Sequence, residues 1–595
     1  MTHRSSVLPA AGTDAPAAER HSGFLGSRER VRLVLVVAFL LAAAFRIGLS
    51  LSRTGPLVVG DEIGYLAHAR ILAGGPPIDL SSSTYYYSGS ALFSLPGYWL
   101  SSDPTTIYQI ALVIQALVSA AALPLLYLLT RELGISRGLA LSAAVAATTG
   151  VDAVFWSNYV LTESLLTSSV ILWVWLTARV VRAGPGRTGS ICAVLLGLTF
   201  GLMAATHPRG VLLVAIGAIT GVVLIRRIGW RSVALCGAAS ALALGGAFWL
   251  NVVGMRANYP TRPLSGLIPA NRGLEESGVG LVDQIVSTLG QVWYVSAATG
   301  LIGLYGLAHV WILALRGDRV LRLPRLAAAV LITLAGVAFT FGSATVLLVS
   351  KTSASPDYLV YGRYAAALVP VLVAFGVIGL LQTADKVVWI IRGATVVAAG
   401  LLVVVVSVGL DNFDTSKNAK PFPIPGVSVL SALVAGDSTE LHQVPVTIAA
   451  VAFFVLCCAI VGRLRRSSPL VLTTLVAAVG VALSISAVAT IVYSADASAY
   501  RDGAVLDVPA ITGATRIAWD TSISGGAGPN AVARLNFGFF ARNAELVPFD
   551  SRTGTPSDDS ALVAAGRRWK GGAIGFVELY RVPGRDIVLW ARTAG

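Results

Sequence analysis

Two adjacent acidic residues follow the first apolar stretch of the chain, in the segment Gly60-Asp61-Glu62-Ile63. A carboxylate beside a membrane can accept the proton of a hydroxyl group, or it can bind a divalent cation, here at Asp61. Apolar residues at helical spacing over 63–71 predict a short amphipathic helix on the outer membrane surface. In such a helix Asp61 can equally be the N-cap, and Glu62 a first-turn acid favoured by the helix dipole.

A second pair of acids, Asp152 and Glu163, lies in a short connection between two later apolar stretches. A carboxylate at the edge of a membrane span is costly to desolvate, so we expect it to face a cavity or a partner. The alternative for each residue is a solvated loop acid. With Asp61 and Glu62, these residues form the acidic part of a candidate site.

Cations are scarce on the side of the membrane that carries these acids. The candidates are Arg46, Arg209, Lys351 and Arg363. Arg209 follows the expected helix break at His207-Pro208, and Arg363 lies in the segment Tyr361-Gly362-Arg363-Tyr364. Guanidinium groups bind phosphate oxygens by paired hydrogen bonds, so we expect Arg209 and Arg363, with Lys351, to hold a phosphate. The alternative is that these side chains reach toward lipid headgroups.

Aromatic residues surround the candidate site in the sequence. We expect Tyr65, His68, Tyr361 and Tyr364 to line a substrate. A second aromatic set predicts an interfacial belt, although its rings also suit stacking against sugars. This set comprises Tyr85, Tyr86, Tyr87, Tyr98 and Trp99.

The rest of the sequence places these residues on a membrane protein. Of its 595 residues 55% are hydrophobic and only 12% are charged, whereas about 25% of residues in soluble domains are charged. About thirteen stretches reach the roughly 20 apolar residues that a membrane span requires. The sequence therefore predicts an all-α polytopic membrane protein with outer juxtamembrane helices.

The net charge of +14 does not indicate nucleic-acid binding, because the arginines form short clusters between apolar stretches. Such clusters are typical of cytoplasmic loops and place the N-terminus in the cytoplasm. An odd number of spans then places the C-terminus outside. The four cysteines lie in apolar stretches and have no metal-binding or disulfide pattern.

Three segments differ in composition. Residues 1–30 read as a disordered cytoplasmic leader, 31–493 as the transmembrane domain and 494–595 as a small extracytoplasmic α+β domain. In the last segment we expect strands over 574–580 and 587–590, and a helix from Ser557 to about Trp569.

External carboxylates and membrane-level cations together suit the transfer of a sugar from a lipid phosphate to a hydroxyl group. The carboxylate would accept the hydroxyl proton or bind a cation, and the arginines would stabilise the departing lipid phosphate. A lipid-linked saccharide flippase or other transporter would instead need charged residues at mid-membrane, for which Arg46 is the main candidate. A noncatalytic scaffold for envelope assembly would use Asp61 and Glu62 only as a helix cap.

The chain resembles the GT-C superfamily of glycosyltransferases that use polyprenyl-phosphate sugars. This superfamily includes protein O-mannosyltransferases, aminoarabinose transferases acting on lipid A, and mycobacterial arabinofuranosyltransferases. The resemblance covers residues 30–495 and rests on the order of short motifs together with an external C-terminal domain. These motifs are Asp61-Glu62 after the first span, Leu161-Thr162-Glu163-Ser164, and Arg363-Tyr364 before Pro370.

The resemblance implies a GT-C-like fold and an inverting transferase in the cytoplasmic membrane. Its partners would be a polyprenyl-phosphate sugar donor and an extracytoplasmic polysaccharide, lipid or protein acceptor. Asp61 would be the catalytic base or a metal ligand with Glu62 as its neighbour, and Glu163 or Asp152 the second acid. Arg209 and Arg363 would hold the donor phosphate. The chain lacks the Asp-x-Asp pair of oligosaccharyltransferases in the second outer loop, which disfavours that branch and a metal requirement.

Overall fold

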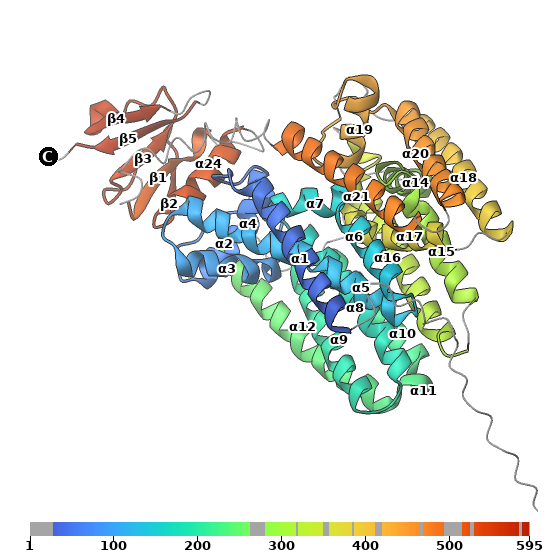
Figure 1. Ribbon diagram of the computed structural model, residues 1–595. Coiled ribbons are helices and arrows are strands. Elements are labelled where there is room, and N and C mark those ends of the chain that lie inside the picture. Colours follow the sequence, from blue (N-terminus) through green and yellow to red (C-terminus); the bar gives the residue numbers. More distant parts are fainter. Residues whose placement is uncertain are drawn as a thin grey trace, which may run out of the picture.

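The computed structural model describes most of the chain. The described residues are 28–81, 83–261, 280–316, 319–348, 356–382, 386–410, 419–464, 468–492, 514–523, 529–581 and 586–593. The structure has a large helical bundle and a small domain containing a sheet near the C-terminus (Figure 1).

The first half of the bundle extends from α1 to α12. Its helices are α1 (Arg28–Ser50), α2 (Val59–Leu72), α3 (Ala91–Leu100), α4 (Pro104–Ala120), α5 (Ala122–Glu132), α6 (Arg137–Thr148), α7 (Val151–Phe155), α8 (Glu163–Ala183), α9 (Arg187–Thr206), α10 (Pro208–Val223), α11 (Ile225–Ile228) and α12 (Trp230–Asn258). Short 3-10 turns η2 (Ser88–Ser90) and η3 (Trp156–Asn158) precede α3 and α8.

The second half follows the same pattern. Its helices are α14 (Leu281–Ala298), α15 (Ile302–Leu315), α16 (Arg322–Leu348), α17 (Val369–Leu381), α18 (Lys386–Leu410), α19 (Pro425–Ala435), α20 (Gln443–Arg463) and α21 (Ser468–Ala487), which the π-helical turn η9 (Val488–Val492) extends. Three 3-10 turns precede α17: η6 (Pro356–Tyr358), η7 (Gly362–Tyr364) and η8 (Ala366–Leu368).

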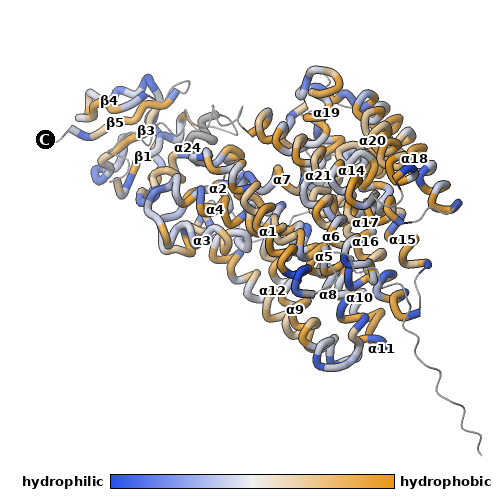
Figure 2. Tube along the Cα trace, viewed as in Figure 1, coloured by the Kyte–Doolittle hydropathy of each residue, from blue (hydrophilic) through white to orange (hydrophobic). Residues whose placement is uncertain are grey.

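Ten helices in the described part of the chain are long and apolar enough to cross a membrane, or up to 12 if each of two bent pairs is one span. Figure 2 shows apolar residues over most of the bundle. The chain is therefore a multi-pass membrane protein, and the predicted fold class is confirmed. The count of about thirteen included α10, whose 16 residues fall short of the roughly 20 that a span requires.

Two pairs of consecutive helices are sharply bent. The segments Arg137–Thr148 and Val151–Asn158 meet at 69°, and α14 and α15 meet at 101°. At the second break Gly300 has φ 55° and Leu301 has φ 60°. Among the described residues, Leu301 is the one non-glycine residue with a positive φ, a backbone conformation that residues with a Cβ rarely adopt. The left-handed pair turns the chain sharply and starts α15.

Helix α2 differs from the surface helix that the sequence predicts. It begins at Val59 after the N-cap Val58, so Asp61 and Glu62 lie in its first turn and Asp61 is not the N-cap. Residues 62–70 are all buried, because η2, α3, α12 and α24 (Pro529–Phe540) pack around the helix. The prediction of a helix is confirmed, but its amphipathic placement on the membrane surface is wrong.

The C-terminal domain contains a mixed sheet of five strands. They are β1 (Arg516–Asp520), β2 (Glu545–Phe549), β3 (Leu562–Ala565), β4 (Phe576–Arg581) and β5 (Val588–Arg592), in the order β2-β1-β3-β5-β4. Strand β1 pairs in parallel with β2 and β3, and β5 pairs antiparallel with β3 and β4. The predicted strands over 574–580 and 587–590 match β4 and β5. The predicted helix over 557–569 is wrong, because all four residues of β3 are buried in the sheet.

This domain packs against α2 and α3. Arg70 on α2 donates to the carbonyl oxygen of Gly538 in the last turn of α24, at 2.5 Å, and to that of Ala544 beyond the helix, at 2.9 Å. Arg534 on α24 forms an ion pair with Asp79 at 3.1 Å. The domain therefore lies on the side of the bundle that carries Asp61, and Figure 1 shows α11 at the opposite end. The boundary at 493/494 falls outside the described residues, as do residues 1–27, so the predicted domain limits stay predictions.

Candidate active site

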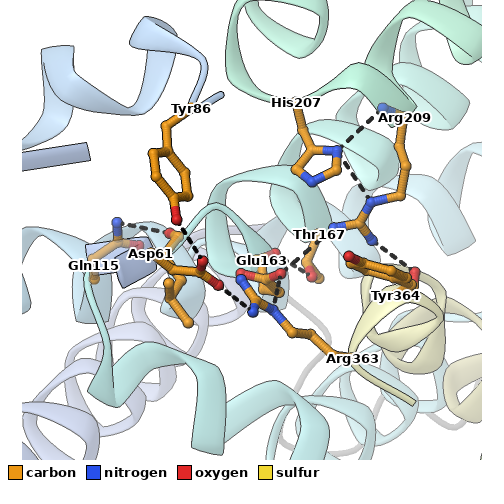
Figure 3. Close-up of polar contacts among 10 residues, drawn as sticks. Asp61, Tyr86, Gln115, Glu163, Thr167, His207, Arg209, Arg363 and Tyr364 are labelled. Carbon is orange, nitrogen blue, oxygen red and sulfur yellow. Dashed lines mark hydrogen bonds and ion pairs between the residues drawn. The ribbon is translucent and has the colours of Figure 1, made fainter. Parts of the chain in front are cut away.

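Arg363 bridges the two acids that the sequence singled out. Its Nη1 lies 2.5 Å from Asp61 Oδ2, and its Nε lies 2.7 Å from Glu163 Oε1 (Figure 3). The three side chains come from α2, the start of α8 and the turn η7. Because the guanidinium group is planar with donors in a fixed fork, this bridge sets the spacing of the two carboxylates.

Arg209 approaches the same acid from α10. Its Nη2 lies 3.5 Å from Glu163 Oε1, and its Nη1 donates to the Tyr364 carbonyl at 2.8 Å. Its Nε donates to His207 Nδ1 at 3.2 Å, and the guanidinium carbon lies 4.5 Å from the centre of the Tyr364 ring. Two arginines and two carboxylates therefore form one network, which we call the Asp61–Arg363 cluster (Asp61, Glu163, Arg209 and Arg363).

The members of this cluster differ in exposure. The Asp61 side chain is 27% exposed, whereas Arg209 and Arg363 are 8% and Glu163 is 1% exposed. Glu163 Oε2 is buried and has no hydrogen-bond partner among the described residues. A buried carboxylate is strongly destabilised unless cations are close. Glu163 therefore anchors the two arginines, and Asp61 is the acid that a substrate can reach.

Local backbone structure fixes the position of each member. The amide of Arg363 donates to the Pro423 carbonyl at 2.9 Å, and a Cβ at the preceding Gly362 would overlap the Tyr294 ring. Only glycine allows that close approach. Glu163 is the first residue of α8, and Arg209 follows Pro208 at the start of α10, where proline fits without loss of a hydrogen bond.

Tyr86 is a site residue that the sequence analysis assigned to the aromatic belt. Its hydroxyl donates to Asp61 Oδ1 at 3.1 Å, and its ring meets Tyr65 edge-on at a centroid distance of 5.4 Å. Burial and, less strongly, the Asp61 carboxylate raise the pKa of Tyr86, so its phenol stays a donor. Tyr87 and Tyr98 are also buried, and Trp99 is 68% exposed. The belt interpretation therefore fits Trp99 but not these tyrosines.

Glu62 is not part of the cluster. Its Oε2 accepts from the amides of Leu57 and Val58 at 2.7 and 2.9 Å. Its Oε1 accepts from the Tyr108 hydroxyl at 2.7 Å and the Val160 amide at 2.8 Å. The side chain is fully buried, and these four donors occupy both oxygens. Glu62 joins the N-terminal end of α2 to α4 and to the residue Val160 after η3, an arrangement that suits a positioning role rather than the predicted catalytic role.

Asp152 and His68 also lie away from the cluster. Asp152 is a buried residue of α7, not a loop acid, and accepts from the Tyr294 hydroxyl at 2.8 Å. His68 is fully buried, with Nδ1 2.5 Å from Ser88 Oγ and Gly254 of α12 packed against the ring. Burial lowers the pKa of His68 to about 3. Neither side chain bonds to a member of the Asp61–Arg363 cluster, so their expected roles at the second acid and in the substrate lining stay predictions.

The remaining predicted residues are three tyrosines, Arg46 and Lys351. Tyr361 and Tyr364 pack with ring centroids 4.9 Å apart beside the arginines, and Tyr65 lies under Tyr86. Arg46 is buried and donates to Ser119 Oγ at 3.0 Å and to the Thr148 carbonyl at 2.6 Å. Arg46 is therefore bonded within the bundle and does not reach toward lipid headgroups, as the alternative required, or stand free for a transported substrate. Lys351 lies outside the described residues.

The described residues do not form a cation site at Asp61. No group of three or more His, Cys, Asp or Glu side chains among them lies close enough to hold a metal ion. Asp61 Oδ2 faces the Arg363 guanidinium and Oδ1 faces the Tyr86 hydroxyl, so a cation there would have to displace a positive group. The predicted divalent cation does not fit this donor set.

His207 was seen in the sequence only as a helix break. In the structure it orients Arg209 by accepting from both its amide and its Nε, at 3.1 and 3.2 Å. The His-Pro-Arg order was the available signal, because a histidine N-cap aims its ring at the second residue of the helix that follows.

Gln115 on α4 supports the turn before α8 by donating to the Leu161 carbonyl at 3.1 Å.

Comparisons with known proteins identify the fold. No protein-family model matches the chain, and no curated protein sequence matches it. The crystal structure of ArnT from Cupriavidus metallidurans in the apo state is similar over 94% of this chain and 98% of that chain, with 14% identity and a TM-score of 0.53. The chain has a GT-C fold. A second structure of the same protein, bound to undecaprenyl phosphate, is similar over 96% of this chain and 99% of that chain, with 12% identity and a TM-score of 0.54.

The GT-C fold extends over nearly the whole chain, including most of the C-terminal domain. The resemblance that the sequence motifs indicated is thus confirmed at the level of the fold. Within this GT-C fold, the Asp61–Arg363 cluster lies on the side where the C-terminal domain packs.

Proposed function

We propose that this protein is a membrane glycosyltransferase. It moves a sugar from a polyprenyl-phosphate donor to a hydroxyl group of an extracytoplasmic cell-envelope acceptor, with inversion at the anomeric carbon. The observation that supports this function best is the bridge from Arg363 to Asp61 and Glu163. It joins an acid that can take a proton to cations that can hold a phosphate.

Donor binding changes the partners of Arg363. A donor phosphate competes with Asp61 for the guanidinium group, because both are anions that accept the same N–H donors. Asp61 Oδ2 accepts from Arg363 at 2.5 Å and Oδ1 accepts from Tyr86 at 3.1 Å. In the absence of the sugar donor, each carboxylate oxygen therefore already accepts a hydrogen bond. When the phosphate draws Arg363 away, Oδ2 becomes free to accept the proton of the acceptor hydroxyl.

The reaction is then a single displacement. The acceptor oxygen forms a bond to the anomeric carbon while the bond from that carbon to the phosphate oxygen breaks. The hydroxyl proton passes to Asp61, and the polyprenyl phosphate leaves with the electron pair. Arg363 and Arg209 stabilise the charge on the leaving phosphate, which therefore needs no proton. Attack opposite the leaving group inverts the anomeric centre.

The lipid part of the donor follows from the fold. A GT-C protein of similar structure binds undecaprenyl phosphate, which supports a polyprenyl phosphate as the leaving group here. The positive-inside rule places the arginine-rich connections in the cytoplasm. The cluster and the C-terminal domain then face the extracytoplasmic side of the plasma membrane, where the acceptor is a polysaccharide, a lipid or a protein.

Transport is less well supported, because Arg46, its main sequence candidate, is bonded to Ser119 and to backbone carbonyls. The function is tested with purified protein in nanodiscs and a panel of radiolabelled polyprenyl-phosphate sugars offered to envelope extracts. We expect one donor to label an envelope acceptor at a rate that depends on protein concentration. Movement of an intact labelled donor across the bilayer without product would support a flippase. A panel that gives neither product nor movement would favour a scaffold.

A further inference from the structure

Two short connections meet at the arginine-rich end of the bundle. Residues 184–186 join α8 to α9, and Gly229 joins α11 to α12. An ideal Cβ on Gly229 would lie 3.2 Å from Pro185 Cβ, and one on Gly184 would lie 3.8 Å from the Arg227 carbonyl oxygen. The two connections therefore pack directly against each other, far from the C-terminal sheet (Figure 1).

Both connections end in a helix whose N-terminus has no side-chain cap. The N-cap residues are Gly186 with φ 148° and Gly229 with φ 83°, and neither has a side chain that can accept from the first-turn amides. These helices have 20 and 29 residues. Each long helix places a partial positive charge at its N-terminus, and here two such ends point to the same place.

A cavity of about 380 Å³ lies between these two helix ends. Its polar side chains are Arg187, Ser190, Arg231 and Ser232. Neither arginine forms an ion pair in the part of the chain that the structure describes, although Arg231 lies 5.8 Å from the centre of the Trp230 ring. We call this space the arginine cavity. It combines two cations with two helix N-termini and has no acid among its lining residues.

Ser232 points independently to a ligand. The residue is only 2% exposed and lines the arginine cavity, yet its hydroxyl has no hydrogen-bond partner among the described residues. Because Ser232 lines the cavity, its hydroxyl is available to donate to a ligand there. A ligand oxygen in the cavity would supply the missing partner.

Apolar surface continues from the cavity along both helices. Ile191 and Leu195 on α9 are 52% and 46% exposed, and Trp230 and Leu235 on α12 are 67% and 41% exposed. In a membrane protein such residues contact acyl chains, and a tryptophan marks the boundary between headgroups and hydrocarbon. The arginine cavity therefore opens at the level where a phospholipid carries its phosphate.

We propose that the arginine cavity binds the phosphate group of an anionic phospholipid, with Arg187, Arg231, Ser232 and the first-turn amides of α9 and α12 as donors. The acyl chains then lie on the exposed apolar residues of these helices. Basic pockets between helices at a cytoplasmic membrane surface suit such headgroups. The site is separate from the Asp61–Arg363 cluster and does not depend on the glycosyltransferase function.

The test measures lipid binding to the purified full-length protein by native mass spectrometry, with phosphatidylglycerol added against a phosphatidylcholine background. The test variant is R187Q/R231Q. The matched control is R226Q/R227Q, which removes the same charge from exposed residues of α11 that do not line the cavity. Each charge-assisted hydrogen bond from a cavity arginine to the phosphate contributes about tenfold in affinity, whereas an exposed arginine outside the cavity makes no such bond. We expect the test variant to weaken phosphatidylglycerol binding by about tenfold or more and the control to change it by less than about twofold.

A third variant, Ser232→Ala, keeps all charges and should weaken binding by a few fold through one lost hydrogen bond. Equal binding by wild type and R187Q/R231Q would overturn the proposal, and so would an equal loss in the α11 control. A parallel titration with inorganic phosphate distinguishes the source of the anion. If phosphate alone displaces phosphatidylglycerol at matched concentrations and stabilises the protein as much, the ligand is a free anion and not a lipid.

Discussion

Asp61 and Arg363 lie 302 positions apart in the sequence, and Arg363 Nη1 lies 2.5 Å from Asp61 Oδ2. Their contact requires α2 and the turn η7 to be in place together. The same guanidinium group reaches Glu163, so one side chain couples the exposed acid to the buried acid. In the proposed reaction, this coupling would let a donor phosphate act on Asp61 without touching it, through the arginine that both anions share.

Replacing Arg363 by lysine should reduce transfer. Lysine keeps the charge but has a single ammonium group, so it cannot hold Asp61 and Glu163 in one fixed fork. We expect Arg363→Lys to lower kcat/KM for the donor by about 10²–10³, the cost of losing one preorganised electrostatic donor. Kinetics with the best donor measure this effect. Arg256→Lys, at an exposed position near the end of α12, serves as control and should stay near wild type.

The Arg363–Glu163 pair also stabilises the fold. Arg363→Ala leaves Glu163, only 1% exposed, with Arg209 as its remaining cation, and this should destabilise by about 3 kcal/mol. Adding Glu163→Ala removes the unpaired charge, so the double variant should be more stable than Arg363→Ala yet equally inactive. Thermal unfolding and transfer assays on the four proteins complete the cycle. Simple addition of the two single effects on stability would argue against this pairing.

Glu62 should matter for stability and not for chemistry. Glu62→Ala removes an acceptor from four donors, and each buried donor left unpaired costs about 1–3 kcal/mol. We expect a melting temperature well below that of wild type. Glu62→Gln keeps the shape and should give a folded protein whose transfer rate stays within a few fold of wild type. A normally stable Glu62→Gln protein that had lost transfer would show that Glu62 takes part in the reaction.

His68 should make stability fall in acid. Burial lowers its folded-state pKa to about 3, below the value of about 6.5 for an unfolded histidine. The unfolded state therefore binds one more proton between these values, so stability is full above pH 6.5 and decreases as the pH falls toward 3. Unfolding measured against pH should show a dependence steeper than that of His68→Asn by up to about 1.4 kcal/mol per pH unit. Identical pH profiles would mean that His68 is not held neutral.

Arg70 should hold the C-terminal domain on α2. It donates to the carbonyl oxygens of Gly538 and Ala544, which would be buried without partners in Arg70→Gln. Hydrogen exchange in α24 should accelerate in this variant, while exchange in the core of the bundle stays slow. The control is Arg552→Gln, because Arg552 is 72% exposed and pairs with Asp550 within its own loop. Unchanged exchange in α24 would contradict the proposed docking role.

The sequence predicted the membrane fold and four members of the site, and it misplaced their neighbours for a physical reason. Successive residues of a helix point about 100° apart, so the adjacent acids Asp61 and Glu62 cannot face the same partner. Asp61 meets Arg363, and Glu62 turns into the core toward Tyr108. A motif of adjacent acids therefore identifies the segment but not which acid does the chemistry.

Other details depend on tertiary packing that a single sequence does not encode locally. Tyr86 is one of three consecutive tyrosines, and only the packing of η2 against α2 selects it as the partner of Asp61. Strand β3 has four apolar residues, too few to distinguish a buried strand from a helix by periodicity. Hydropathy alone identified α10 as apolar. It did not show that the helix is short, because it begins after the break at His207 and ends before the turn at Leu224.

In the proposed reaction the donor phosphate draws Arg363 away from Asp61, which then accepts the proton of the acceptor hydroxyl, and Asp61→Asn tests this step most directly. The measurement compares transfer of the sugar with binding of polyprenyl phosphate for wild type and Asp61→Asn. Loss of the general base should lower the transfer rate by about 10²–10⁴. Polyprenyl phosphate should bind at least as tightly as to wild type, because asparagine no longer competes for Arg363. A variant that transfers at the wild-type rate, or that loses phosphate binding together with transfer, would contradict the account.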